Sequence, residues 1–201
     1  MHTALRATSL TLAKFLEDRL KSDPGLSAFF SGGNMVVSLN TPQEMKENNL
    51  EGLSVWLYRV IRDEERLNDP PRWLSPTQLQ PPPLPVRLHY LITPITEKKQ
   101  GASPETEQVI LGKALQALHS RPRLRGMDLQ DDFIGTEVEL NVRLEALTLE
   151  EISRVWEALE GSYQLSVSYE VSVVNIASER EPEGVTPVEV VLPEYGLIVS
   201  S

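Results

Sequence analysis

Hydrophobic side chains recur along the chain in two spacings, which predict helices and strands. Residues 3–21 carry apolar side chains at helical spacing and predict an amphipathic helix that ends at Asp-Pro-Gly, residues 23–25. The apolar stripe of this helix is formed by Leu5, Leu12, Phe15, Leu16 and Leu20. Residues 35–39 follow a glycine-rich turn and predict a short strand.

Residues 54–62 and 84–95 predict two further strands. The first is partly apolar on both faces, which indicates either an interior strand covered on both sides or a strand with one face against a partner. The second places apolar side chains on one face at alternate positions. These are Leu84, Val86, Leu88, Tyr90 and Ile92.

The second half of the chain predicts two helices and two strands. Ser103 as N-cap and Pro104 at the first helical position begin a helix that runs to about residue 119. Residues 136–146 alternate strictly and predict a strand with one wet face. Residues 163–176 predict the longest strand by the same alternation.

Between these two strands, Thr148 and Glu151 form a capping-box pattern that begins a helix. The predicted buried side of this helix contains Leu149, Ile152, Trp156 and Leu159. The order helix, strand, strand, strand, helix, strand, helix, strand predicts an α/β (α+β) fold. In it, a mixed, mostly antiparallel sheet is flanked by helices that pack mainly on one side.

Residues 69–85 contain seven prolines and predict an extended loop, neither helix nor central strand. Trp73 and Leu74 are expected to pin this loop to the body. Two interpretations stay open, a pinned connector and an arm that docks onto a partner. The composition changes after Ser178, where glutamate and proline become frequent. We therefore predict a domain over residues 1–178 and an acidic, proline-containing tail over residues 179–201. Val188 and Val190 belong to a strand that this tail could add.

The composition excludes several classes of function. With 40% hydrophobic and 24% charged residues the chain is typical of a globular protein. Its net charge of -10 argues against nucleic-acid binding and against docking to an anionic membrane. The absence of cysteine excludes thiolate catalysis and cysteine-ligated metals. No signal peptide or membrane span is evident, so we expect a cytoplasmic protein.

Catalytic patterns are almost missing from the sequence. The three histidines, His2, His89 and His119, have no metal-ligand spacing, and we expect no cofactor and no metal. The carboxylate doublets at residues 64–65, 131–132 and 150–151 lie at surface-type positions, which leaves a carboxylate-based hydrolase as a minor alternative. No phosphate-binding glycine loop or nucleophile elbow occurs. The sequence therefore favours assembly over catalysis.

Basic residues gather around the second predicted strand and the proline-rich stretch. They are Arg59, Arg62, Arg66, Arg72 and Arg87. Either they anchor an acidic partner surface or they are ordinary solvated charges. We take Arg59, Arg62, Trp73, Arg87, Val188 and Val190 as the candidate partner-interface residues.

Four stretches in this order, behind an N-terminal helix, resemble a known family. They are residues 54–60, 82–93, 107–119 and 149–159, the last continuing into 163–173. The Pro-Pro-Leu-Pro strand entry at residues 82–85 and the L-x-x-E-E-x-x-R-x-W-x-x-L pattern at 147–159 are the most specific parts. Together they resemble the cap, or tail-terminator, proteins of extracellular contractile injection systems of the antifeeding-prophage and virulence-cassette type. The resemblance covers roughly residues 1–178.

The resemblance implies a structural role. Such terminators form a six-fold ring on the end of the inner tube distal to the baseplate, stop its growth and help to fix the last sheath ring. The implied partners are further copies of the chain, the inner-tube protein and the sheath protein. The implied location is the bacterial or archaeal cytoplasm during assembly, and then a released particle. A tail that adds a strand to a neighbouring subunit or to the sheath fits this picture. The alternative is an adaptor that binds a peptide through the Trp73 loop.

Overall fold

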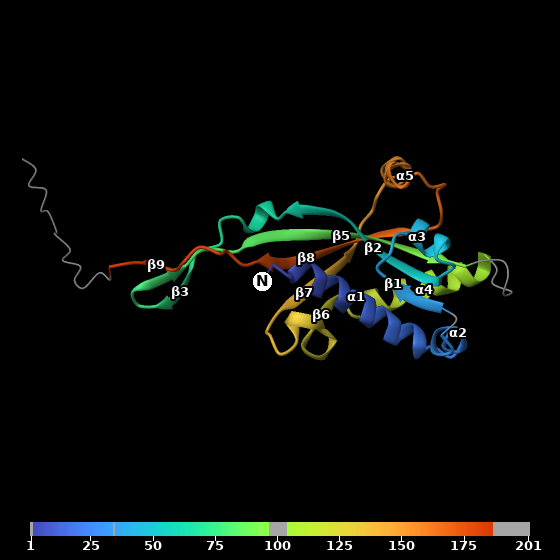
Figure 1. The fold of residues 1–201 in the computed structure, drawn as a ribbon, viewed down its shortest axis with the longest axis horizontal. Coiled ribbons are helices and arrows are strands. Elements are labelled where there is room, and N and C mark those ends of the chain that lie inside the picture. Colours follow the sequence, from blue (N-terminus) through green and yellow to red (C-terminus); the bar gives the residue numbers. More distant parts are fainter. Residues whose placement is uncertain (1, 34, 97–103, 187–201) are drawn as a thin grey trace, which may run out of the picture.

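The computed structural model describes residues 2–33, 35–96 and 104–186, and its centre is a six-stranded sheet in the order β1-β2-β5-β8-β7-β6 (Figure 1). The strands are β1 (Met35–Ser38), β2 (Glu51–Arg62), β5 (Leu84–Ile95), β8 (Val167–Ile176), β7 (Glu139–Leu144) and β6 (Arg123–Arg125). β1 runs parallel to β2, and the other neighbouring strands are antiparallel. The predicted mixed, mostly antiparallel sheet is confirmed.

Helices α1 (Ala4–Lys21), α2 (Ser27–Ser31) and α4 (Pro104–Ser120) cover one face of the sheet (Figure 1). The apolar stripe predicted for the first helix packs here against alternate residues of β5, such as Leu88 and Tyr90. The Tyr90 hydroxyl lies 2.8 Å from Ser9 Oγ, which joins α1 to the sheet inside the core. Burial raises the pKa of Tyr90 well above its ordinary value. This layer holds the main hydrophobic core.

Helix α5 (Leu149–Ala158) lies on the opposite face (Figure 1). Its Ile152 and Trp156 pack on Leu91, which points away from the main core because strand side chains alternate. The capping box of Thr148 and Glu151 is present as predicted. Leu149 was expected in the buried stripe but is 70% exposed, since the first helical position turns away from the sheet. The helices that build the main core thus lie on one face, as expected, and α5 adds a smaller hydrophobic cluster on the other face.

The hydrophobic pattern did not predict several short elements or their exact bounds. Helix α3 (Pro42–Glu47) was not predicted, although Thr41 and Glu44 form a complete capping box at its start. The polar loop expected over residues 121–132 contains β6 and 3₁₀ turns. β8 begins at Val167, so Tyr163 and Leu165 lie outside the strand predicted to contain them and are exposed. The N-cap predicted at Ser103 lies outside the described residues.

A second, three-stranded sheet projects from one end of the body (Figure 1). It consists of β3 (Arg72–Ser75), β4 (Gln78–Gln80) and β9 (Glu183–Gly184). The proline-rich stretch predicted as an extended loop is thus a hairpin in the structure, with Pro76 between its strands. β9 pairs antiparallel with β4. We call β3, β4 and β9 the arm.

Candidate partner interface

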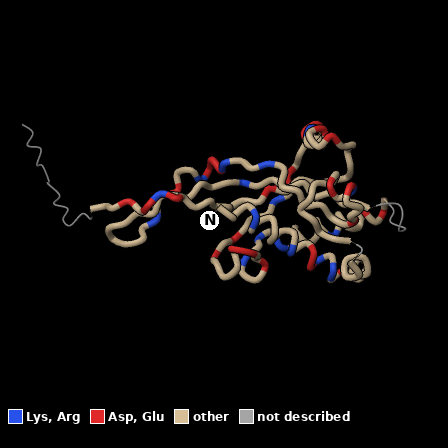
Figure 2. The backbone as a smooth tube through the Cα atoms, in the orientation of Figure 1, with Lys and Arg blue, Asp and Glu red and all other residues tan. Residues whose placement is uncertain are grey.

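The arm exposes apolar side chains far from the core. Trp73 is 56% exposed and Leu74 is 51% exposed, so neither pins the hairpin to the body as expected. Figure 2 shows the end of the arm's hairpin without charged residues, whereas acidic and basic residues alternate over the body. Exposed aromatic side chains on a projecting element are typical of protein contact sites. The arm is therefore the first candidate interface.

Three of the five arginines of the predicted basic cluster meet at the outer face of β2 and β5. Arg59, Arg62 and Arg87 line a shallow hollow of about 450 Å³ together with acidic residues of the 64–65 doublet. Arg66 instead binds Asp69 at 2.9 Å, and Arg72 begins the arm. The structure thus brings together three of the six candidate residues. It places Trp73 apart from them, and Val188 and Val190 lie outside the described residues.

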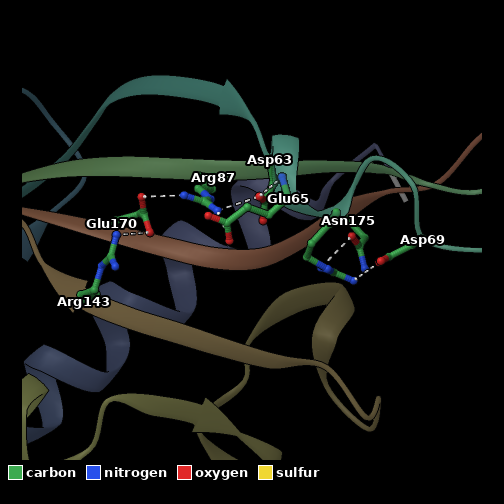
Figure 3. Close-up of polar contacts among 8 residues, drawn as sticks. Asp63, Glu65, Asp69, Arg87, Arg143, Glu170 and Asn175 are labelled. Carbon is green, nitrogen blue, oxygen red and sulfur yellow. Dashed lines mark hydrogen bonds and ion pairs between the residues drawn. The ribbon is translucent and has the colours of Figure 1, made fainter.

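Arg87 differs from the other two because its charge is used inside the molecule (Figure 3). Its Nη2 lies 2.8 Å from Asp63 Oδ1 and 3.0 Å from Glu65 Oε2, and its Nη1 lies 3.8 Å from Glu170 Oε2. The hydrogen bond to Asp63 raises the pKa of the Arg87 guanidinium. Arg143 binds the other Glu170 oxygen at 3.2 Å. This network ties the end of β2 to β5, β8 and β7.

Arg59 and Arg62 remain more available to a partner. Arg59 is exposed and has no hydrogen bond or ion pair with the residues that the structure describes. The contact between Arg62 and Glu64 spans 3.9 Å between two exposed side chains, which is worth little in water. Of the basic residues around this hollow, these two can therefore meet an acidic partner surface without breaking internal pairs.

His89 belongs to a second polar group on the same face of the sheet. Its Nδ1 lies 2.9 Å from Glu145 Oε1, Ser168 Oγ donates to Glu145 Oε2 at 2.5 Å, and Tyr58 contacts Ser168 at 2.9 Å. Burial alone would raise the pKa of Glu145, but the hydrogen bonds from His89 and Ser168 hold it below the ordinary value. These hydrogen bonds link Glu145, which directly follows β7, to β5 and β8.

His89, Glu145 and Glu170 are the described residues whose arrangement comes nearest to a metal site. One ligand atom from each lies within 4.8 Å of the others, and His89 Nε2 is buried without a partner. Arg87 and Arg143 already occupy the Glu170 carboxylate, however, and a metal ion would have to displace them. The arrangement is that of an ion-pair network that joins strands.

The carboxylate doublets do not converge on a common site. Asp131 pairs with Arg6 at 2.7 Å, Glu150 pairs with Arg154 at 2.6 Å, and Glu151 caps α5. The doublet at residues 64–65 is highly exposed at the rim of the hollow. Within the described part of the chain no two of these doublets flank one cavity, so they do not provide the paired acid and base of a hydrolase.

The sequence indicates which charged residues lie on the polar faces of the strands, but it does not indicate which of them pair with one another. Alternation alone assigns Glu170 and Arg143 to the polar faces of their strands, as observed. It does not reveal that His89 lies opposite Glu170 or that Asp63 meets Arg87, because these pairings depend on strand register. The capping signal at Thr41 could have identified α3.

Two solved structures share this fold. The sheath/tube terminator of PVC, an extracellular contractile injection system, in its extended state is 16% identical, with a TM-score of 0.62 over 98% of this chain and 64% of that one. The anti-feeding prophage cap, a tube-terminating cap, is 22% identical, with a TM-score of 0.54 over 79% of this chain and 53% of that one. The fold is thus of the tube-terminator class. The chain covers between about half and two thirds of the length of these two proteins.

The chain belongs to the family described as the Pvc16 N-terminal domain, whose model matches residues 7–189. This confirms the resemblance noted in the sequence and extends it beyond residue 178. No curated protein matches the chain. Among the described residues, no helix is both long and apolar enough to cross a membrane.

Proposed function

We propose that this chain is a structural cap of a contractile injection system, which ends the inner tube and the sheath at the end distal to the baseplate. The observation that carries the proposal is the similarity in fold to a sheath/tube terminator over 98% of this chain. Membership of the Pvc16 N-terminal domain family supports it through the sequence. The polar networks on the sheet fit a rigid structural role, since their charges are neutralised within the molecule. The protein acts without catalysis.

The cap works as a ring of six copies, the number that the family resemblance implies. A ring needs a head-to-tail interface that closes on itself, with different surfaces meeting at each junction. The arm with Trp73 supplies one such surface, and the hollow with Arg59 and Arg62 supplies another. The tube and sheath proteins then bind the assembled ring. Assembly takes place in the cytoplasm, and the cap leaves with the particle.

The test is to mix the purified chain with the tube protein and to count capped tube ends by negative-stain microscopy. Native mass spectrometry of the same sample gives the number of copies in the ring. We expect hexamers and tubes that stop growing once capped. Tubes of unchanged length, together with a chain that stays monomeric with and without tube protein, would overturn the proposal.

An adaptor that binds a peptide through the arm is the second candidate, and the exposure of Trp73 is what favours it. Such an adaptor would bind its target as a monomer and would leave tube growth unchanged. The same two measurements therefore separate the candidates.

A further inference from the structure

An apolar groove lies between the C-terminal end of α4 and the strands β7 and β8. Its volume is about 640 Å³, and its surface is mainly apolar. The apolar lining consists of Leu115, Leu118, Pro122, Val142, Leu144 and Tyr169. Leu144 is 51% exposed, although it is a large aliphatic residue at the end of a strand. Such a surface on a soluble protein indicates a contact site.

One wall of the groove is an unfinished edge of the main sheet. β6 pairs with residues 139–141 of β7, and the last contact on this side is the Val142 amide, which donates to the Pro122 carbonyl at 2.7 Å. Leu144 pairs with Tyr169 of β8 on its other side. In the part of the chain that the structure describes, no strand lies beside Leu144 on the β6 side. A short extended segment can add to this edge.

The chain itself contains a segment with the matching pattern. Residues 188–192 read Val-Glu-Val-Val-Leu. In an added strand Val188, Val190 and Leu192 would share one face, and Glu189 and Val191 would lie on the other. The β-branched residues favour a strand. His119 also lines the groove, and an imidazole N–H there can donate a hydrogen bond to a carboxylate that follows the apolar face, such as that of Glu194.

The position of β9 decides which copy supplies this segment. β9 pairs with β4 in the arm, and the described part of the chain ends just after it, at residue 186, on the arm and away from the body (Figure 1). The groove lies in the body, beside α4. Because the described chain ends on the arm and the groove lies in the body, residues 188–192 start at a distance from their own groove and are suited to reach that of the next copy in a ring.

We propose that the groove at Leu144 receives residues 188–192 of a neighbouring copy, which add a strand to β7. The inference rests on the proposed ring. It joins two candidate residues, Val188 and Val190, to an acceptor surface that the sequence did not indicate. Each ring junction would then be closed by main-chain hydrogen bonds and by apolar side chains in the groove.

Disulfide trapping in the full chain tests the proposal, because the natural sequence has no cysteine. The double variant L144C/V190C is assembled, oxidised and run on a denaturing gel. We expect a ladder of covalent multimers up to the size of the ring. The single variants and the pair L149C/V190C, whose first position lies on α5, serve as controls and should give no ladder beyond dimers.

Three other results would overturn the assignment. A monomer that migrates faster after oxidation would show that the tail occupies its own groove. Capped tubes without any cross-link would show that another segment or protein fills the groove, while the proposed function stands. Failure of the unaltered chain to form rings or caps would remove the proposed function and this inference together.

A second variant measures the energy of the contact without relying on oxidation. Leu144→Asp places a charge in the groove at an exposed position, so the fold itself is little affected. We expect ring assembly to need a roughly tenfold higher protein concentration, because the charge is buried against the apolar tail. Leu149→Asp is the matched control and should leave assembly unchanged. Equal assembly of both variants would contradict the proposal.

Discussion

The Arg87 guanidinium on β5 lies 2.8 Å from the Asp63 carboxylate, which follows β2 and is only 4% exposed. This ion pair closes the outer end of the longest strand pair in the sheet, just before the chain leaves for the arm. The Asp63 amide also donates to the Pro85 carbonyl at 2.9 Å. The ion pair and this hydrogen bond therefore hold the end of β2 against β5 at the point where the chain leaves the main sheet.

Replacing Arg87 by leucine should destabilise the protein strongly. The change leaves the buried Asp63 carboxylate without its cation, and breaking a buried pair in this way costs about 3 kcal/mol. Urea denaturation followed by circular dichroism measures the loss in the free energy of unfolding. Arg62→Leu, at an exposed arginine of the same hollow, is the control and should change stability by less than about 0.5 kcal/mol. Equal losses for both variants would contradict the role given to Arg87.

Glu145 should make the stability depend on acid pH. Its pKa is lowered in the folded state from an ordinary value of 4.5. Its stabilising effect is therefore complete above that value and disappears as the pH falls through the lower, folded-state pKa. Free energies of unfolding measured from pH 7 to pH 3 should fall less steeply for Glu145→Gln than for the natural chain. Identical slopes would show that His89 and Ser168 do not stabilise the carboxylate.

Gly52 in β2 should tolerate no side chain. Its φ is +130°, and a Cβ atom there would lie 2.0 Å from the Val36 carbonyl oxygen of β1. Gly52→Ala should therefore cost about 3 kcal/mol or more, since backbone atoms of the parallel pair must move. Gly112→Ala is the matched control. Gly112 is an exposed glycine inside α4 with open space around it, so alanine should raise stability by about 0.5–1 kcal/mol. Thermal unfolding of both variants decides the point.

Trp73 should matter for assembly and not for folding. Its side chain is largely exposed on the arm, so Trp73→Ala should change the free energy of unfolding by less than about 0.5 kcal/mol. In the capping assay, the variant should nevertheless cap fewer tube ends than the natural chain, because exposed tryptophans commonly anchor protein interfaces. Met127→Ala, at a methionine that is 97% exposed on the body, is the control. Full capping by the Trp73 variant would exclude the arm from the interface.

Local patterns predict much of this fold because they reflect local causes. The apolar stripe of α1, the proline that begins α4 and the capping box of Thr148 and Glu151 are each recognisable within one or two turns of chain. The alternation in β5 is equally local, and it assigns Leu88 and Tyr90 to the core correctly. The same alternation leaves Leu91 on the other face, but it does not say that α5 will cover it.

The sequence by itself determined the order of the main elements, the mixed sheet and the family to which the chain belongs. Only the tertiary structure decided that His89 faces Glu170, that Asp63 meets Arg87, that β9 returns to pair with β4 and that β6 stops short of Leu144. The reason is physical. Helix stripes and caps depend on residues a few positions apart, whereas strand register and open edges depend on segments that meet only after the chain has folded.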